Sequence, residues 1–234
     1  MSEQLSIVVP VYNERATIAT VVERLLTIDL PLGREVIVVN DGSRDGTREV
    51  LDDLARRYPQ LKVIHSPQNC GKGHAVRLGF ACAAGTIVAI QDADLELDPA
   101  ELSVLVEPIL DRATDVVYGS RFLSGQRTGS RLNRAANGFL TGVTNLLYGS
   151  SLTDMETCYK VIRADVVRSL ALSANGFDLE PEITAQLLLR GHTIIERPVT
   201  FSPRSRAAGK KIHWHDGFTA IKVLVRCRLQ RVSR

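Results

Sequence analysis

The chain has 234 residues, of which 44% are hydrophobic and 24% charged, a composition typical of a globular protein with one large core. Its net charge of +3 is uneven, because ten Lys or Arg and one acid lie from Arg197 onward, and such a basic end predicts an anionic partner. An aromatic content of 5% without a stacking pattern argues against nucleic-acid binding. The cysteines lack zinc-site spacing and predict reduced thiols in a cytoplasmic protein. No apolar run reaches the ~20 residues of a membrane span.

Along the first half of the chain, short β-branched segments alternate with segments of helical periodicity. Five strands are predicted, at residues 5–11, 35–39, 62–65, 86–90 and 115–118. One helix start is marked by Asp98 as N-cap, Pro99 in the first turn and Glu101 as the acid of a capping box. Because the strands are apolar on both faces, we predict an α/β fold, a mostly parallel sheet with helices on both faces in a single domain.

The second half is less regular. Its patterns predict helices at 133–148, 181–189 and 218–229, extended segments at 157–162 and 193–200, and a basic loop at 202–211. We assign the main domain to residues 1–211. Residues 212–234 form a basic amphipathic helix that either belongs to the same domain or contacts a membrane surface.

Polar clusters follow three of the predicted strands, at the point where each strand ends. Their sequences are Pro10-Val11-Tyr12-Asn13-Glu14, Asn40-Asp41-Gly42-Ser43 and Gln91-Asp92-Ala93-Asp94-Leu95-Glu96. Ligands of parallel sheets bind beyond the carboxyl ends of the strands, so we expect the clusters to meet at one edge. In an extended segment Asp92 and Asp94 point the same way, and carboxylates suit Mg²⁺ or Mn²⁺. A solvated acidic loop is the alternative.

Two further features at this edge have two interpretations each. Gly71-Lys72-Gly73 opens the helix after the third strand, and a helix N-terminus with a lysine favours an anion such as a diphosphate. A tight turn into the helix explains the glycines equally well. Asp41 either accepts hydrogen bonds from a base or ribose, or serves a turn of the Asp-Gly-Ser type.

Together these segments resemble the family-2 glycosyltransferases of GT-A fold, and among them the dolichol- or polyprenol-phosphate hexose synthases. The resemblance extends over residues 5–211 and also includes Tyr118-Gly119-Ser120-Arg121, Thr153-Asp154-Met155-Glu156-Thr157-Cys158-Tyr159-Lys160 and Gly176-Phe177-Asp178-Leu179-Glu180-Pro181-Glu182. It implies a metal-dependent hexosyltransferase, cytoplasmic or peripheral on the inner face of a membrane. Two residues depart from the pattern: Glu96 stands where Gln is frequent, and Cys158 stands where Gly precedes the aromatic residue.

The resemblance also implies which residues bind the substrates. A GDP- or UDP-hexose donor is expected at Pro10, Tyr12, Glu14, Asp41, Lys72, Asp92, Ala93 and Asp94, and the metal at Asp92, Asp94 and Glu96. As a set, Arg204, Lys210 and Lys211 resemble a mobile lid over the diphosphate, and a solvated basic loop is the alternative. A dolichyl or undecaprenyl phosphate acceptor is expected at Arg121, Arg131 and Arg134.

The nature of the acceptor decides which residues are catalytic. A lipid phosphate is already an oxyanion and needs no base, so Asp94, Lys72 and Arg121 are then the catalytic candidates. A hydroxyl acceptor needs proton removal, for which Asp154 and Glu182 are the candidates. A sugar-phosphate nucleotidyltransferase is a third interpretation, since parallel sheets with paired carboxylates serve that chemistry too. The sequence leaves the base, the sugar and the oligomeric state open.

Overall fold

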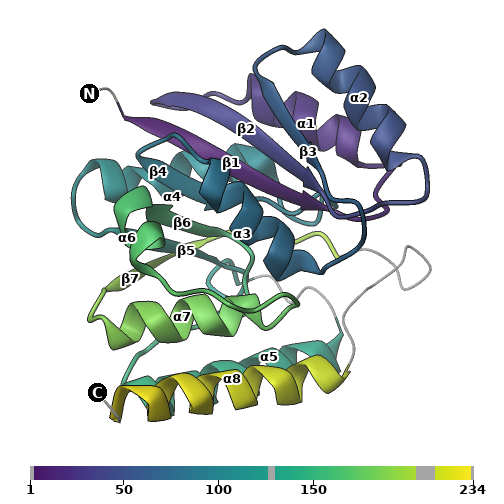
Figure 1. The fold of residues 1–234 in the computed structure, drawn as a ribbon. Coiled ribbons are helices and arrows are strands. Elements are labelled where there is room, and N and C mark those ends of the chain that lie inside the picture. The colour runs from purple at the N-terminus through teal and green to yellow at the C-terminus, as the bar shows by residue number, and fades with distance from the viewer. Residues whose placement is uncertain (1–2, 126–129, 204–213, 233–234) are drawn as a thin grey trace.

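A computed structural model describes residues 3–125, 130–203 and 214–232 of the chain (Figure 1). Its centre is a seven-stranded sheet in the order β3-β2-β1-β4-β6-β5-β7. The strands are β1 Gln4–Val11, β2 Gly33–Asn40, β3 Leu61–His65, β4 Ile87–Ile90, β5 Val116–Ser120, β6 Lys160–Arg163 and β7 Ile194–Pro198. Strand β6 is antiparallel to β4 and β5, whereas the other pairs are parallel. The mostly parallel sheet predicted from the sequence is confirmed.

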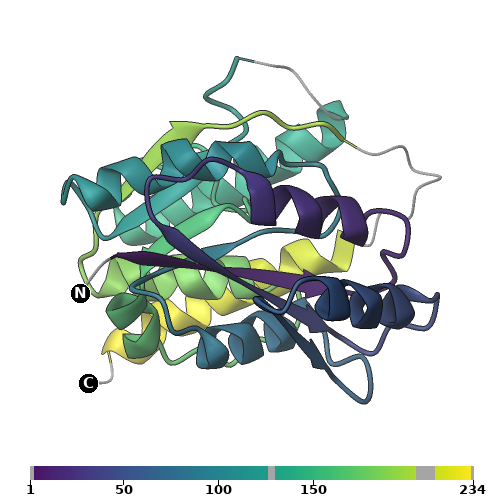
Figure 2. The same cartoon turned by 90° about the horizontal axis from the view of Figure 1, so that it is seen from above.

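Helices cover both faces of this sheet because its strands are apolar on both sides. The helices are α1 Ile18–Thr27, α2 Thr47–Arg57, α3 Lys72–Cys82, α4 Leu102–Leu110, α5 Arg131–Tyr148, α6 Ala164–Ser169, α7 Leu179–Leu189 and α8 Trp214–Val232. One core joins the sheet to α1, α2 and α4, and a second joins it to α3, α6 and α7. Figure 2 shows α1 and α4 on one side of the sheet and α3 and α6 on the other.

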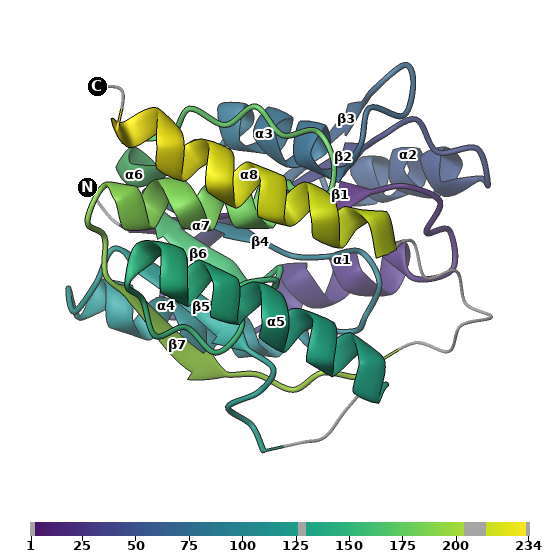
Figure 3. The same ribbon diagram turned by 90° about the horizontal axis from the view of Figure 1, so that it is seen from below.

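Helices α5 and α8 form an outer layer that packs against α7 rather than against the sheet (Figures 1 and 3). A third core lies between these helices and includes Leu140, Ala185 and Leu224. The hydroxyl of Tyr148 on α5 donates a hydrogen bond to the carbonyl oxygen of Leu224 on α8 at 2.6 Å. The described part of the C-terminal segment therefore packs on the main domain. Within the described ranges, no helix has the length and apolarity that crossing a membrane requires.

The structure corrects two local expectations. The sequence predicts an extended segment at residues 157–162, but β6 begins only at Lys160. The buried ammonium of Lys160 donates to the carbonyls of Met155 and Thr157 and so stabilises a turn before the strand. Asp98 is an N-cap as predicted and accepts from the N–H of Ala100 at 3.1 Å, but it opens a 3₁₀ turn, Pro99–Glu101. Glu101 forms no capping box: its Oε1 accepts from the N–H of Thr200 at 2.6 Å.

Candidate active site at the carboxyl edge of the sheet

The structure brings the polar ends of β1 and β2 together, as the parallel register predicts. The N–H of Asn13 donates to the Oγ of Ser43 at 2.9 Å, and the Oδ1 of Asn13 accepts from the N–H of Arg44 at 2.8 Å. Asn13 has a φ of 52°, a left-handed conformation that Asn tolerates better than most residues. The segment that contains Pro10, Tyr12 and Glu14 therefore turns sharply toward the end of β2.

Asp41 is buried and shapes the glycine turn before α3. Its Oδ1 accepts from the N–H of Cys70 at 2.9 Å, and its Oδ2 accepts from the N–H of Gly71 at 2.7 Å. A donor base or ribose that contacts Asp41 would have to share these oxygens. This geometry supports a structural role for Asp41, but in the glycine turn before α3 and not in the predicted Asp-Gly-Ser turn, where the N–H of Ser43 donates to Oδ1 of Asn40.

The two glycines of the turn approach protein backbone closely. Gly71 has a φ of +101°, and a Cβ there would lie 2.2 Å from the carbonyl oxygen of Asn175. A Cβ on Gly73 would lie 2.5 Å from the carbonyl oxygen of Ala174. Side chains are excluded by this contact, so the glycines serve a tight turn against residues 174–175. Lys72, between them, is the first residue of α3.

Lys72 is shared by two carboxylates from distant parts of the chain. Its Nζ lies 2.9 Å from Oδ1 of Asp92, at the end of β4, and 2.8 Å from Oε1 of Glu180, in the first turn of α7. Burial by itself lowers the pKa of Lys72, but the negative charges of Asp92 and Glu180 outweigh burial and hold that pKa well above its usual value. Burial raises the pKa of Asp92, but Lys72 overcomes this effect and keeps the pKa below its usual value. Both groups are therefore charged near neutral pH.

The segment after Asp92 carries the other expected metal ligands. Oδ1 of Asp94 accepts from the N–H of Glu96 at 3.1 Å, and Leu95 between them has a φ of 61°. The carbonyl oxygen of Ala93 accepts from the hydroxyl of Thr17 at 2.7 Å, which ties this loop to the start of α1. The thiol of Cys158, the residue that departs from the family pattern, is buried, and burial together with the nearby charge of Asp92 raises its pKa well above the usual value.

A divalent metal fits this edge as a partial site. Within residues 3–125, 130–203 and 214–232, no group of three His, Cys, Asp or Glu side chains is arranged to hold a metal, so Asp92, Asp94 and Glu96 do not form a complete site. Mg²⁺ is commonly bound by one or two carboxylates together with substrate phosphates. Asp92 and Asp94 supply the right oxygens, and the ammonium on Asp92 shows that this carboxylate is already paired with a cation. Asp92 and Asp94 would therefore hold a metal only in part, and the oxygens of a bound diphosphate would have to complete its coordination.

Arg121 is fixed by Asp154 in a buried two-pronged ion pair. Nε of Arg121 donates to Oδ2 of Asp154 at 2.7 Å, and a terminal nitrogen donates to Oδ1 at 2.7 Å. The Asp154 side chain is 0% exposed, and its Oδ2 also accepts from the N–H of Arg121. Burial lowers the pKa of Arg121, but hydrogen bonding to Asp154 outweighs it, so that the pKa is raised. Asp154 thus orients Arg121 toward the edge.

Glu182, the other expected base, also has a structural environment. Its oxygens accept from the N–H and hydroxyl of Ser173 and from the N–H of Ala174, at distances of 2.7–2.9 Å. Arg226 on α8 lies 3.3 Å from its Oε1. Glu182 therefore holds the segment against which the glycine turn packs.

Sequence reasoning missed two carboxylates of the site, Glu180 and Glu156. Oε2 of Glu180 and Oε1 of Glu156 are buried without a hydrogen-bond partner in the described part of the chain. Burial, with the nearby charge of Glu180, raises the pKa of Glu156 to about 7. Glu180 lies in the same motif as Glu182, and residues two apart on a helix point to nearly opposite sides. The helical phase separates the two carboxylates, but the sequence carries no signal for which of them faces Lys72.

The expected acceptor and lid residues are only partly described. Arg131 is exposed and Arg134 half-buried in the first turn of α5, three residues apart and so on one side of that helix. Arg204, Lys210 and Lys211 lie outside the described residues. The described residues just before them, up to 203, run beside the loop that contains Asp94 and Glu96. There the N–H of Ser202 donates to the carbonyl of Glu96 at 2.8 Å.

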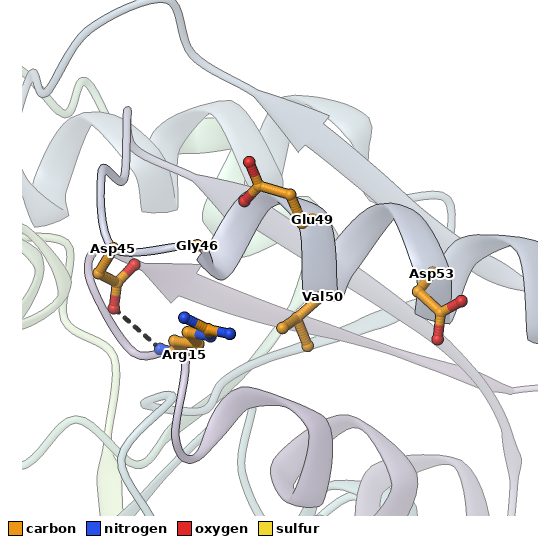
Figure 4. A pocket seen from close by; sticks show the side chains of 6 residues that line it. All are labelled: Arg15, Asp45, Gly46, Glu49, Val50 and Asp53. Atoms are coloured by element: carbon orange, nitrogen blue, oxygen red, sulfur yellow. Dashed lines mark hydrogen bonds between the residues drawn. The ribbon is translucent and has the colours of Figure 1, made fainter.

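Two surface hollows flank this edge. The first, of about 560 Å³, lies between the loop after β1 and α2 (Figure 4). Its charged lining comprises Asp45, Glu49 and Asp53 against a single Arg15, a balance that disfavours a diphosphate. The second, of about 190 Å³, is lined by Leu95 and Glu96 among others and adjoins the Asp94 loop. The second hollow is therefore the one next to the proposed metal ligands.

Comparison with known proteins gives three relatives with related activities. The chain is 29% identical to a dolichol-phosphate mannosyltransferase of Pyrococcus furiosus, with 88% of this chain and 59% of that protein covered. It is 28% identical to a polyprenol monophosphomannose synthase of Mycolicibacterium smegmatis, covering 89% and 81%. It is 30% identical to an undecaprenyl-phosphate mannosyltransferase of Micrococcus luteus, covering 87% and 85%. The chain thus spans less than two thirds of the archaeal protein but most of the two bacterial ones.

Solved structures and a family model complete the comparison. Glucosyl-3-phosphoglycerate synthase from Mycobacterium tuberculosis, in complex with UDP, has the same fold, with a TM-score of 0.74 at 21% identity over 98% of this chain and 80% of that one. The same enzyme has been solved with Mn²⁺, UDP-glucose and phosphoglyceric acid, at a TM-score of 0.74 and 21% identity over 97% and 80%. The family model for glycosyl transferase family 2 matches residues 6–170. The chain therefore belongs to glycosyl transferase family 2, as its motifs had indicated.

Proposed function

We propose that the chain is an inverting glycosyltransferase that moves a hexose from GDP- or UDP-hexose to a polyprenyl phosphate. One observation carries the choice of acceptor: the two carboxylates expected to act as bases, Asp154 and Glu182, are both engaged in holding other groups. An acceptor phosphate is already an anion and needs no base. The three relatives, whose names specify lipid phosphate acceptors, support the same choice.

The charges at the edge suit the leaving group of this reaction. Negative charge develops on the nucleoside diphosphate as the sugar leaves, and groups that are already oriented stabilise it best. Lys72 stands at the N-terminus of α3, where the helix dipole also favours an anion. A divalent ion, Mg²⁺ or Mn²⁺, bound at Asp92 and Asp94, supplies Lewis-acid stabilisation of the same charge.

Arg121 completes the edge on the acceptor side, together with Arg131 and Arg134. A guanidinium held in place by a buried carboxylate keeps one orientation, as phosphate recognition requires. In this arrangement the acceptor phosphate attacks the anomeric carbon from the side opposite the diphosphate. A single displacement of this kind inverts the configuration at that carbon.

We also propose that the outer layer rests on an anionic membrane surface. Large apolar side chains of α5 and α8 are exposed to solvent: Leu132 at 74%, Phe139 at 62%, Leu146 at 85%, Phe218 at 67%, Val225 at 39% and Leu229 at 61%. Exposed basic residues accompany them, namely Arg131, Lys222, Arg226 and Arg228. The described side chains of these two helices include no acid.

This combination favours lipid over a second copy of the chain. Apolar side chains interleaved with lysine and arginine are typical of helices that lie in a bilayer interface and attract anionic headgroups. Two copies joined through this layer would bring like charges together. Helix α5, which Arg131 begins, starts on the side toward which β1 runs (Figure 1).

The test is a transfer assay with purified protein, Mg²⁺ or Mn²⁺, labelled GDP- and UDP-hexoses and a short polyprenyl phosphate. We expect a lipid-extractable product whose anomeric configuration, determined by NMR, is inverted relative to the donor. Polyprenol without phosphate is the matched control acceptor. Transfer to the alcohol with none to the phosphate would contradict the proposal.

A hydroxyl acceptor remains a second candidate because of Glu156. A carboxyl group with a pKa of about 7 and an unpaired oxygen suits a general base. With a hydroxyl acceptor, Glu156→Gln would remove transfer, whereas transfer to a phosphate would survive the substitution. Membership in glycosyl transferase family 2 sets aside the nucleotidyltransferase interpretation.

A further inference from the structure

The ammonium of Lys72 is paired with a carboxylate oxygen of Asp92 that the proposed metal would need. Nζ lies 2.9 Å from Oδ1 of Asp92, and the two side chains are only 14% and 29% exposed. A divalent ion on that oxygen would stand within a few ångströms of a positive charge in a poorly solvated place. Repulsion there is strong, because like charges a few ångströms apart are poorly screened where water is largely excluded. The ammonium and the ion therefore compete for Asp92.

Glu180 provides a second ion-pair partner for the ammonium of Lys72. Its Oε1 is already 2.8 Å from Nζ, its side chain is 5% exposed, and its Oε2 is buried without a partner in the described part of the chain. The ring of Phe177 lies 5.9 Å from Nζ and adds a face that attracts a cation. Lys72 can thus leave Asp92 without becoming an unpaired buried charge.

We propose that the ammonium of Lys72 competes with the divalent metal for Asp92. Glu180 is a positioning residue that keeps the ammonium paired when the metal binds. The inference rests on the proposed function, because it concerns the same site. Its consequence is an order of binding. The metal alone must displace an ammonium and so binds weakly, whereas a nucleoside diphosphate offers oxygens to both the metal and the released ammonium, and so favours joint binding.

The test measures Mn²⁺ binding by calorimetry and by the paramagnetic resonance signal of free Mn²⁺, first with Mn²⁺ alone and then with saturating UDP or GDP. Lys72→Gln keeps a hydrogen-bond donor but removes the charge, and we expect it to bind Mn²⁺ alone at least about tenfold more tightly than the wild type, or ~1.4 kcal/mol. Lys72→Arg keeps the charge and should bind Mn²⁺ alone as weakly as the wild type. Lys62→Gln, which breaks the ion pair of Lys62 with Glu35, is the matched control and should leave the affinity unchanged.

Glu180→Gln should act in the opposite direction from Lys72→Gln. Without the negative charge of Glu180, the ammonium is held more firmly by Asp92, so Mn²⁺ alone should bind several-fold more weakly than to the wild type. This variant keeps Lys72 and provides the decisive measurement if Lys72→Gln does not fold, as judged by circular dichroism. A purely structural role for Glu180 would move the melting temperature but not the Mn²⁺ affinity.

The outcomes separate this inference from the proposed function. Equal Mn²⁺ affinities in folded Lys72→Gln and wild type would overturn the competition, while product formation in the transfer assay would leave the function standing. Absence of Mn²⁺ binding in every variant, with and without nucleotide, would overturn both.

Discussion

The buried pair of Arg121 and Asp154 allows the sharpest test of how the site is held. Asp154→Asn keeps the size of the side chain but removes the charge that faces Arg121. Asp154 is 0% exposed and accepts three hydrogen bonds from Arg121, so the substitution leaves a guanidinium that is mostly buried without its counter-charge. Breaking one side of a buried ion pair costs about 3–5 kcal/mol. For a chain of this size, 1 kcal/mol shifts Tm by about 2–4 °C, and we therefore expect a loss of about 6–20 °C.

Urea denaturation and thermal unfolding, both followed by circular dichroism, measure this change. Asp53→Asn is the matched control, because Asp53 pairs with Arg56 on the surface at 3.3 Å and such pairs contribute about 0–1 kcal/mol. The double variant with Arg121→Met should recover part of the lost stability, since both charges are then gone. A stability change below about 1 kcal/mol in Asp154→Asn, with transfer abolished, would refute the positioning role and restore Asp154 as a catalytic base.

Three further outcomes are expected. Gly71→Ala should destabilise the fold by at least about 2 kcal/mol in urea denaturation, because the added Cβ would clash with the carbonyl oxygen of Asn175. Gly138→Ala, on the open side of α5, is the control and should stabilise the fold by up to about 1 kcal/mol. The folded-state pKa of Glu156 is raised from 4.5 to about 7, so the native state binds the extra proton and wild-type stability should fall by about 3 kcal/mol as pH rises between these values. Glu156→Gln should remove that fall, and an unchanged pH profile would contradict it. Phe139→Glu should weaken sedimentation with phosphatidylglycerol vesicles about tenfold, whereas Val104→Glu, at an exposed apolar residue of α4, should not; similar losses in both would count against the membrane face.

The strands of the first half, and the edge of the sheet at which they end, were predictable because the local sequence patterns agree with the overall fold. The segments that became β1, β2 and β4 are centred on runs of β-branched, apolar residues, a pattern that fits a sheet covered on both faces. Once the sheet is parallel, the ends of these strands must lie at one edge, and Asp41 and Asp92 are found there. The start of β6 was less predictable, because it depends on the ammonium of Lys160, whose burial is set by tertiary packing even though its partners are local.

The roles of individual carboxylates could not be read from the sequence. Whether Glu180 or Glu182 faces Lys72 depends on the rotation of α7, and that rotation is set by packing between the sheet and the outer helices. Asp154 looked like a base because its partner Arg121 lies 33 residues earlier in the chain, beyond the reach of any local pattern. The acids of a motif are visible in a sequence, but their counter-charges are not.

The glycine turn has a mechanical consequence for the whole molecule. On one side it carries Lys72, and on the other it presses on the carbonyls of Ala174 and Asn175 without room for a methyl group. That same segment is tethered by Glu182, which in turn meets Arg226 on α8. A continuous series of contacts thus connects α8 to Lys72, so we expect a displacement of α8 to reach the lysine through residues 174–175.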